Sequence, residues 1–240
     1  MRFVTATGLA IASALCVAQL HAQQPPAGQR GGGMQMPDTA RKVPGGGIHA
    51  PGWQGKPDAG TGSINDSKFD LKGTDIEIST GPAAVYWNAK DTASGDYTVS
   101  ATFTEPHYMS SNDHPHPYGV FIAGNKLDTD QPTLLYCAAY GDGRVIVRAF
   151  PTSFAPGGSR RAIANEAVHK AADKGAPVTQ TVAMSVKGDK VECSVNGATV
   201  ATLNKSDLVG AGKLDSTDGA AGIRVAHNVD VVVKDFKVSK

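Results

Sequence analysis

The sequence has few cysteines, few aromatic residues and no excess of charge of either sign. Its 240 residues include three Cys and two Trp, with 23 Lys and Arg against 22 Asp and Glu. A nucleic-acid partner requires a basic surface that displaces counterions from phosphates, and an anionic membrane attracts a polybasic segment. The balanced charge argues against both partners. No Cys or His spacing of the structural-zinc type occurs, so a small molecule, a polymer or another protein is the expected partner.

Long apolar runs are also missing, apart from one at the N-terminus. Arg2 is followed by an apolar stretch from Val4 to about Leu20 and by the small residue Ala22. These are the parts of a secretory signal peptide, and the stretch is too short and too polar for a membrane span. We therefore expect residues 1–22 to be a signal peptide and the mature protein to be secreted or periplasmic.

The next segment has a biased composition. Residues 23–47 contain seven Gly and four Pro without apolar periodicity, and such a segment buries too little surface to offset its chain entropy. We expect a disordered Gly/Pro/Gln-rich linker over 23–47 and one domain over 48–240.

Within that domain the apolar residues recur with a period of two, which is typical of β-strands with one wet face. In DYTVSATFTE (96–105) the residues expected on one face are Tyr97, Val99, Ala101 and Phe103. The segments 181–186 and 191–195 alternate in the same way, and Gly188-Asp189 and Asn196-Gly197 supply hairpin turns around the second. Further strands are expected at 118–123, 132–140, 144–150, 222–227 and 229–238.

Residues 159–175 are rich in Ala and are read either as a helix or as an irregular crossing loop. Many short strands and little helix predict an all-β antiparallel β-sandwich or jelly roll, with an up-and-down barrel as the alternative.

Four segments carry a resemblance to a known superfamily. VAMSVKGDKVECSVNGATVATL, YGVFIAGNKL, LLYCAAYGDGRVIVRAF and AGIRVAHNVDVVVKDFKV resemble the strands of concanavalin A-like, laminin-G-like jelly rolls. The likeness covers about 118–240 and points to an uncharacterised bacterial secreted branch. It implies the lectin/glucanase superfamily, which includes lectins, carbohydrate-binding modules, family 16 endoglucanases and relatives of 3-keto-glycoside hydrolases.

The catalytic motifs of those enzymes are absent. Retaining glucanases of this fold carry an E-x-D-x-x-E strand, and here only Asp75 and Glu77 share a face. These two are more simply explained as solvated strand carboxylates, with Ile76 and Ile78 facing the core. No catalytic residue is assigned, and the expected function is non-catalytic, lectin-like carbohydrate binding. A glycan-active hydrolase or lyase is the alternative, and a structural or protein-interaction domain is the second.

Aromatic, imidazole and guanidinium side chains near the loop 107–117 are the candidate sugar ligands, because rings stack on pyranose faces while polar groups bind hydroxyls. The candidates are Tyr86, Trp87, His114, His116, Tyr118, Arg144 and Arg148. The alternative is that the aromatic rings fill the core, the arginines are solvated and the histidines belong to a surface turn.

Metal binding is a further hypothesis. His114 and His116 each precede a proline, which favours extended backbone. In a β conformation both imidazoles project to the same side as in H-x-H zinc sites, whereas in a polyproline II conformation they diverge. Asp113, His107 or His227 could supply a third ligand. Asn125, Asp128 and Asp130 in AGNKLDTDQP (123–132) indicate either a calcium loop or a turn. Calcium or zinc is thus possible, and no other cofactor is expected.

Cys137 and Cys193 both fall in expected strands. In an oxidising compartment they pair as a disulfide; otherwise they are separate buried thiols. The sequence leaves the oligomeric state open.

Overall fold

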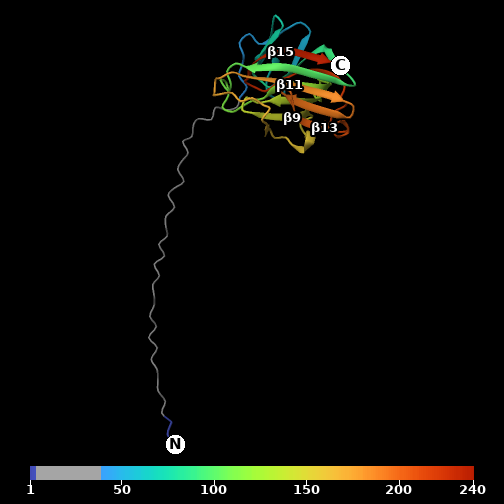
Figure 1. The fold of residues 1–240 in the computed structure, drawn as a ribbon. Coiled ribbons are helices and arrows are strands. Elements are labelled where there is room, and N and C mark those ends of the chain that lie inside the picture. Colours follow the sequence, from blue (N-terminus) through green and yellow to red (C-terminus); the bar gives the residue numbers. More distant parts are fainter. Residues whose placement is uncertain (4–38) are drawn as a thin grey trace. The chain divides into compact units, whose positions relative to one another are not determined.

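The computed structural model describes residues 1–3 and 39–240 of the chain. Most of the predicted signal peptide, and residues 23–38 of the predicted linker, lie outside the described residues. The described chain from residue 39 onward forms two β-sheets packed face to face (Figure 1). The antiparallel β-sandwich predicted from the period of two is therefore confirmed, and the barrel alternative is wrong.

The two sheets have eight and seven strands. In spatial order the first consists of β1 (Gly47–His49), β3 (Lys68–Lys72), β4 (Asp75–Ser79), β15 (Asp230–Ser239), β6 (Tyr97–Glu105), β11 (Val178–Lys187), β12 (Lys190–Val195) and β13 (Ala198–Asn204). The second consists of β10 (Ile163–Ala164), β9 (Arg144–Phe150), β8 (Thr133–Ala139), β7 (Tyr118–Asn125), β14 (Gly219–Val225), β5 (Ala84–Ala93) and β2 (Trp53–Pro57). Neighbouring strands in both sheets pair antiparallel, except that β1 runs parallel to β3.

Helix is confined to short pieces in the described chain: η1 (Ile64–Asp66), η2 (Pro156–Gly158) and α1 (Lys205–Leu208). None of these is long and apolar enough to cross a membrane. The helix considered for residues 159–175 is not formed, and the crossing-loop interpretation is confirmed. The physical reason is that this segment bonds to the turn between β8 and β9: Asn165 N donates to Gly143 O and Ala171 N to Gly141 O.

The first sheet follows the alternation in the sequence. Along β6, Tyr97, Val99, Ala101 and Phe103 are all buried between the sheets, while the residues between them keep partial exposure. The turn at Asn196 and Gly197 has φ of 50° and 85°, as the predicted type I′ hairpin requires. We call the apolar cluster between the two sheets the inner core.

The central part of the second sheet, in β7, β8 and the first half of β5, is buried on both faces. Its strands contribute alternate residues to the inner core and to a separate cluster, here called the outer cluster: Val85, Trp87, Phe121, Leu127, Leu134, Tyr136, Ala138 and Ile146. Because successive side chains of a strand point to opposite faces, the outer cluster lies on the face turned away from the first sheet. Leu127, in the loop after β7, covers part of that face.

A disulfide joins the two sheets. Cys137 on β8 is bonded to Cys193 on β12, with their Cα atoms 6.1 Å apart. Both cysteines are buried in the inner core, so the bond crosses the layer of apolar side chains that holds the sandwich together.

The end of the predicted linker contacts the domain. Arg41 forms an ion pair with Asp230 and its backbone N–H donates to Asn228 Oδ1 at 2.7 Å. Val43 N donates to Asp66 O, and β1 begins at Gly47. The folded unit therefore includes residues that composition alone placed in the linker.

We predict that replacing Cys137 and Cys193 by Ala lowers the free energy of unfolding by about 2 to 4 kcal/mol, because the crosslink restricts the unfolded chain. Urea denaturation with and without reductant measures this. Reductant should shift the midpoint of the wild type and leave that of the double variant unchanged. Equal midpoints for oxidised wild type and double variant would contradict the prediction.

Candidate functional site

Residues on the outer face of the second sheet form rows across neighbouring strands. Strand register places one row in the order Gln54, Trp87, Gly222, Phe121, Tyr136 and Arg148. Gly222 is required here, because a Cβ at this position would lie 2.1 Å from Tyr86 O and 2.5 Å from the Phe121 ring. The missing side chain lets the large rings of this row approach the sheet closely.

The next row contains an ion pair between a buried arginine and a half-buried aspartate. Arg224 on β14 donates from both terminal nitrogens to the two carboxylate oxygens of Asp58, each at 2.6 Å. Its guanidinium lies 5.5 Å from the ring centroids of both Tyr136 and Phe150. Burial disfavours the charged form, but the charge and hydrogen bonds of Asp58 outweigh this and hold the pKa of Arg224 above its usual value.

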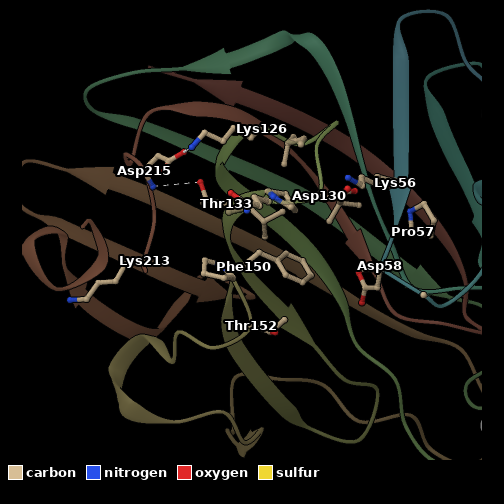
Figure 2. Close-up of a pocket in the computed structure, with 18 of the residues that line it drawn as sticks. Lys56, Pro57, Asp58, Lys126, Asp130, Thr133, Phe150, Thr152, Lys213 and Asp215 are labelled. Atoms are coloured by element: carbon tan, nitrogen blue, oxygen red, sulfur yellow. Dashed lines mark hydrogen bonds and ion pairs between the residues drawn. The ribbon is translucent and has the colours of Figure 1, made fainter. Parts of the chain in front are cut away.

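A cavity of about 910 Å³ opens over this face (Figure 2). Its apolar lining includes Pro57, Val85, Leu134 and Phe150. Its charged lining consists of Lys56, Lys126, Lys213, Asp58, Asp130 and Asp215. Figure 2 shows Lys126 and Asp215 at one side of the cavity and Lys56 and Asp58 at the other. Three lysines and three aspartates thus surround an apolar floor, and their formal charges cancel.

Two contacts hold the rim together. Lys126 and Asp215 form an ion pair at 2.9 Å, and Lys56 donates from Nζ to the backbone oxygen of Thr129. Thr129 lies in the loop that also carries Leu127, so this bond fastens the loop across the sheet to β2. The rim is assembled from segments far apart in the sequence.

Two residues that were predicted to bind a ligand are not accessible at any surface. Tyr86 and Tyr118 have 0% exposure and lie in the inner core, where a ligand cannot reach their rings. Their neighbours in sequence take the other face. Trp87 belongs to the outer cluster and is 8% exposed. Its ring therefore packs among the apolar side chains of the outer face.

The two predicted arginines do lie on one face of β9, as expected from their spacing. Arg144 bonds to Asp142, with Nε 2.6 Å from Oδ2, and sits 4.7 Å from the centroid of the Tyr140 ring. Arg148 is paired with Tyr136 in the register of β8 and β9. Neither is among the residues described as lining the cavity.

Two of the three histidines of the loop 107–117, His114 and His116, come together before β7 begins. His114 and His116 approach with their Nε2 atoms 2.8 Å apart. Asp113 Oδ1 lies 2.6 Å from His114 Nδ1, on the opposite side of that ring. His116 Nδ1 lies 2.7 Å from the backbone oxygen of His227. The ring centroids of His116 and His227 are 4.0 Å apart.

This geometry bears on two sequence hypotheses about metal. Asp113 contacts His114 through Nδ1, on the side of the ring away from the Nε2 atoms; its role as a metal ligand stays a prediction. Within residues 1–3 and 39–240, no three His, Cys, Asp or Glu side chains are grouped to hold a metal ion. In the suggested calcium loop the amide of Asn125 donates to Ala123 O and Asp218 O, which is the bonding of a turn.

A buried carboxyl lies where the histidine loop leaves β6. Glu105 is 5% exposed, and its Oε1 accepts a hydrogen bond from Met109 N at 3.0 Å. Its Oε2 has no hydrogen-bond partner among the described residues. Burial raises the pKa of Glu105 to about 7, the Met109 hydrogen bond opposes this and the charge of Asp230 adds to it. Below about pH 7 the protonated form of this carboxyl therefore predominates where the loop leaves β6.

Most of the cavity residues are invisible to local sequence patterns. Of its charged residues, only Asp130 was singled out, as part of a calcium loop. Lys56, Asp58, Lys213 and Asp215 sit in turns and strand ends, where charged residues are ordinary. Only the arrangement of strands and loops brings them together, so no spacing signal could have identified them.

Comparisons with known proteins support the fold. No family model matches the chain, and no curated protein matches it. Among solved structures, a Bacillus subtilis protein of unknown function with a galectin-like fold has a TM-score of 0.54 and 13% identity, over 78% of this chain and 88% of that one.

Two further structures are somewhat less similar. Carbohydrate-binding module CBM66 from Bacillus subtilis has a TM-score of 0.49 and 12% identity, over 79% of this chain and 96% of that one. The metal-free carbohydrate recognition domain of Emp46p has a TM-score of 0.49 and 10% identity, over 78% and 88%. At such identities only the fold is established: an antiparallel β-sandwich of the jelly-roll, galectin-like type.

We predict that the free energy of unfolding falls as pH rises from about 4.5, the usual value for Glu, through the folded-state pKa of Glu105 at about 7. Below this pH window the Glu105 carboxyl is protonated in both the folded and the unfolded state. Within the window it loses its proton only in the unfolded state, which is thereby favoured. Glu105→Gln removes this titration while keeping an acceptor for Met109.

The variant should therefore gain stability over wild type on going from pH 4 to pH 8, on the order of 2 kcal/mol. Urea denaturation at several pH values tests this, with exposed Glu77→Gln as the control. A pH-independent difference between Glu105→Gln and wild type would rule the account out.

Proposed function

We propose that this protein binds a neutral polysaccharide or oligosaccharide in the cavity over the outer face of the seven-stranded sheet, and does not cleave it. The observation that carries the proposal is the composition of the cavity wall. Three lysines and three aspartates with no net charge surround an apolar floor. A binding site for an anion or a cation would instead concentrate charge of one sign.

The chemistry of a sugar matches this wall. A pyranose ring offers an apolar C–H face and a rim of hydroxyl groups, each of which both donates and accepts hydrogen bonds. Phe150 and its cross-strand neighbour Leu134, together with Val85 elsewhere in the lining, supply apolar surface for the ring face. Lysine ammonium groups donate to hydroxyl oxygens, and aspartate oxygens accept hydroxyl protons. A volume of about 910 Å³ lies within the range of small-molecule sites.

Binding is favoured over cleavage by how the carboxylates are used. Glycoside hydrolysis requires a pair of carboxyl groups, one as acid and one as base or nucleophile. Both oxygens of Asp58 accept from Arg224, and Asp215 is paired with Lys126. Asp130 alone among the cavity carboxylates has no ion pair described. This arrangement holds the rim in shape and supports recognition.

Export to an oxidising compartment is part of the proposal. The N-terminal sequence has the features of a signal peptide, and Cys137 is bonded to Cys193. Disulfides persist in secreted and periplasmic proteins and are rare in the reducing cytosol. A glycan-binding protein in those compartments meets extracellular polysaccharides directly.

Affinity gel electrophoresis against mixed-linkage β-glucan, xyloglucan, galactomannan and dextran tests the proposal, with alginate as an anionic comparator. We expect retardation by at least one neutral polymer and none by alginate. Phe150→Ala and Asp130→Asn should each weaken binding about tenfold, since each removes roughly 1.4 kcal/mol of stacking or hydrogen bonding. Lys187→Ala, an exposed position on the other sheet, is the matched control.

Reducing ends are assayed in the same samples. Retardation lost in the Lys187 variant, or retained in both cavity variants, would contradict the assigned site. Release of new reducing ends by the wild type would contradict the non-catalytic part of the proposal. Circular dichroism of each variant separates loss of binding from loss of folding.

A further inference from the structure

The loop between β7 and β8 forms one wall of the cavity and has few contacts with the rest of the domain. It consists of residues 126–132, here called the β7–β8 loop. Residues 126–131 are exposed except for Leu127, which is 5% exposed and belongs to the outer cluster. The loop residues that line the cavity are Lys126, Leu127, Asp130, Gln131 and Pro132. A movement of this loop would therefore change the shape of the cavity.

Hydrogen bonds within the β7–β8 loop give it a shape of its own. The backbone N–H and the hydroxyl of Thr129 both donate to Lys126 O, at 3.0 and 2.9 Å, and Gln131 N donates to Thr129 Oγ1 at 3.2 Å. Pro132 fixes its own φ angle just before β8 begins. Because these bonds stay inside the loop, it can move as one unit without losing them.

The end of β7 has the features of a hinge. The register of β7 against β8 shifts between Ile122 and Asn125, and the φ angles of Ala123 and Lys126 are 58° and 53°. Non-glycine residues are strained in this left-handed region, and such residues cluster at ligand clamps and switch regions. The Asn125 amide is fixed by its bonds to Ala123 O and Asp218 O. Rotation is therefore expected at Lys126, directly after this fixed residue.

Two polar contacts at the rim hold the β7–β8 loop against the domain. The side chains of the Lys126–Asp215 ion pair are 58% and 41% exposed, and water and salt weaken exposed pairs of this kind. The second contact is the hydrogen bond from Lys56 Nζ to Thr129 O. We call these two contacts the latch, and neither is strong enough to keep the loop closed permanently.

One apolar side chain adds to the latch. Leu127 lies beside Phe121 over Gly124, because a Cβ at Gly124 would be 3.0 Å from Leu127 Cδ1 and 2.9 Å from the Phe121 ring. Lifting the loop would uncover the Phe121 ring, which is fully buried in the closed loop position. The cost of exposing this apolar surface returns the loop to the closed position.

We propose that the β7–β8 loop is a lid, which opens to admit the glycan and closes over it. This inference rests on the proposed function, since the ligand is the one assigned to the cavity. The loop carries Asp130, the cavity carboxylate without a described ion pair, and Figure 2 shows Asp130 between Lys126 and Lys56. Closure brings the Asp130 oxygens to the sugar hydroxyls, so the bound ligand favours the closed position.

Thiol labelling with a maleimide measures opening of the lid without any ligand. Leu127→Cys places a thiol beneath the lid, and Ile78→Cys places one in the inner core, where only unfolding of the sandwich exposes it. Both are made in the full chain with Cys16→Ser, since Cys137 and Cys193 are bonded to each other. We expect the thiol of Leu127→Cys to react at least about 100-fold faster than that of Ile78→Cys, because local opening requires less free energy than global unfolding.

Equal labelling rates for the two thiols would overturn the inference, because the loop would then open only when the whole domain unfolds. Circular dichroism of both variants checks that they are folded. If Leu127→Cys does not fold, relaxation dispersion of the Leu127 methyl groups in the wild type measures the same opening. Absence of exchange in that measurement would contradict the lid.

Variants of the latch test which contacts hold the lid closed. Asp215→Asn and Lys56→Met should each speed labelling of Leu127→Cys about threefold, as expected for exposed polar contacts. Added NaCl should speed it as well, and this salt effect should be smaller with Asp215→Asn. Lys187→Met, an exposed position on the other sheet, is the matched control and should leave the rate unchanged. Rates that neither latch variant changes would contradict the assigned latch.

An oligosaccharide of the best-retained neutral polysaccharide tests closure over the ligand. At saturation it should slow labelling of Leu127→Cys at least about fivefold, because the ligand stabilises the closed position by mass action. An unchanged rate in a variant that the polysaccharide still retards would overturn closure over the ligand. Retardation by no neutral polysaccharide would instead contradict the proposed function, whereas the two thiols compared without ligand still decide whether the loop opens.

Discussion

The centre of the seven-stranded sheet is buried on both faces, and this double burial determines where a ligand can bind. Strands β7 and β8 have almost no exposed residue along their length. One face packs on the other sheet and the opposite face carries the outer cluster, which is covered in part by the loop containing Leu127. A ligand can still reach this face at the cavity, which lies between this loop, the end of β9 and the segment that contains Asp58. The buried Arg224–Asp58 pair fixes the position of that last segment.

The same double burial explains which parts of the fold could be predicted. In strands with one solvent-exposed face, such as β6, alternation of apolar and polar residues indicates which residues point into the core. The inner and outer faces of β6 were therefore predicted correctly. Strands β7 and β8 and the first half of β5 are buried at nearly every position and carry no such signal. The sequence therefore could not tell that Tyr86 and Tyr118 face the inner core while Trp87 faces outward. Hydrophobicity identifies a doubly buried strand, but it does not assign its two faces.

The two candidate sites differ in how much of them the sequence reveals. The spacing of His114 and His116 and their prolines allowed converging imidazoles in a β conformation and diverging ones in polyproline II, and the structure brings their Nε2 atoms together. The role of Asp113 depended on which ring nitrogen it meets, a geometric detail that spacing does not contain. The cavity rim joins residues such as Lys56 and Asp215, separated by most of the domain. Its existence follows from the strand order, which no local motif encodes.

The central claim is that ligand recognition takes place on the outer face of the seven-stranded sheet. Methyl NMR spectra recorded during titration with an oligosaccharide of the best-retained polysaccharide test it most directly. The account predicts shifts of the methyl groups of Val85 and Leu134, which line the cavity. The methyl groups of Thr102 and Thr181, on the outer face of the eight-stranded sheet, should stay unchanged. Shifts confined to Thr102 and Thr181 would contradict the account.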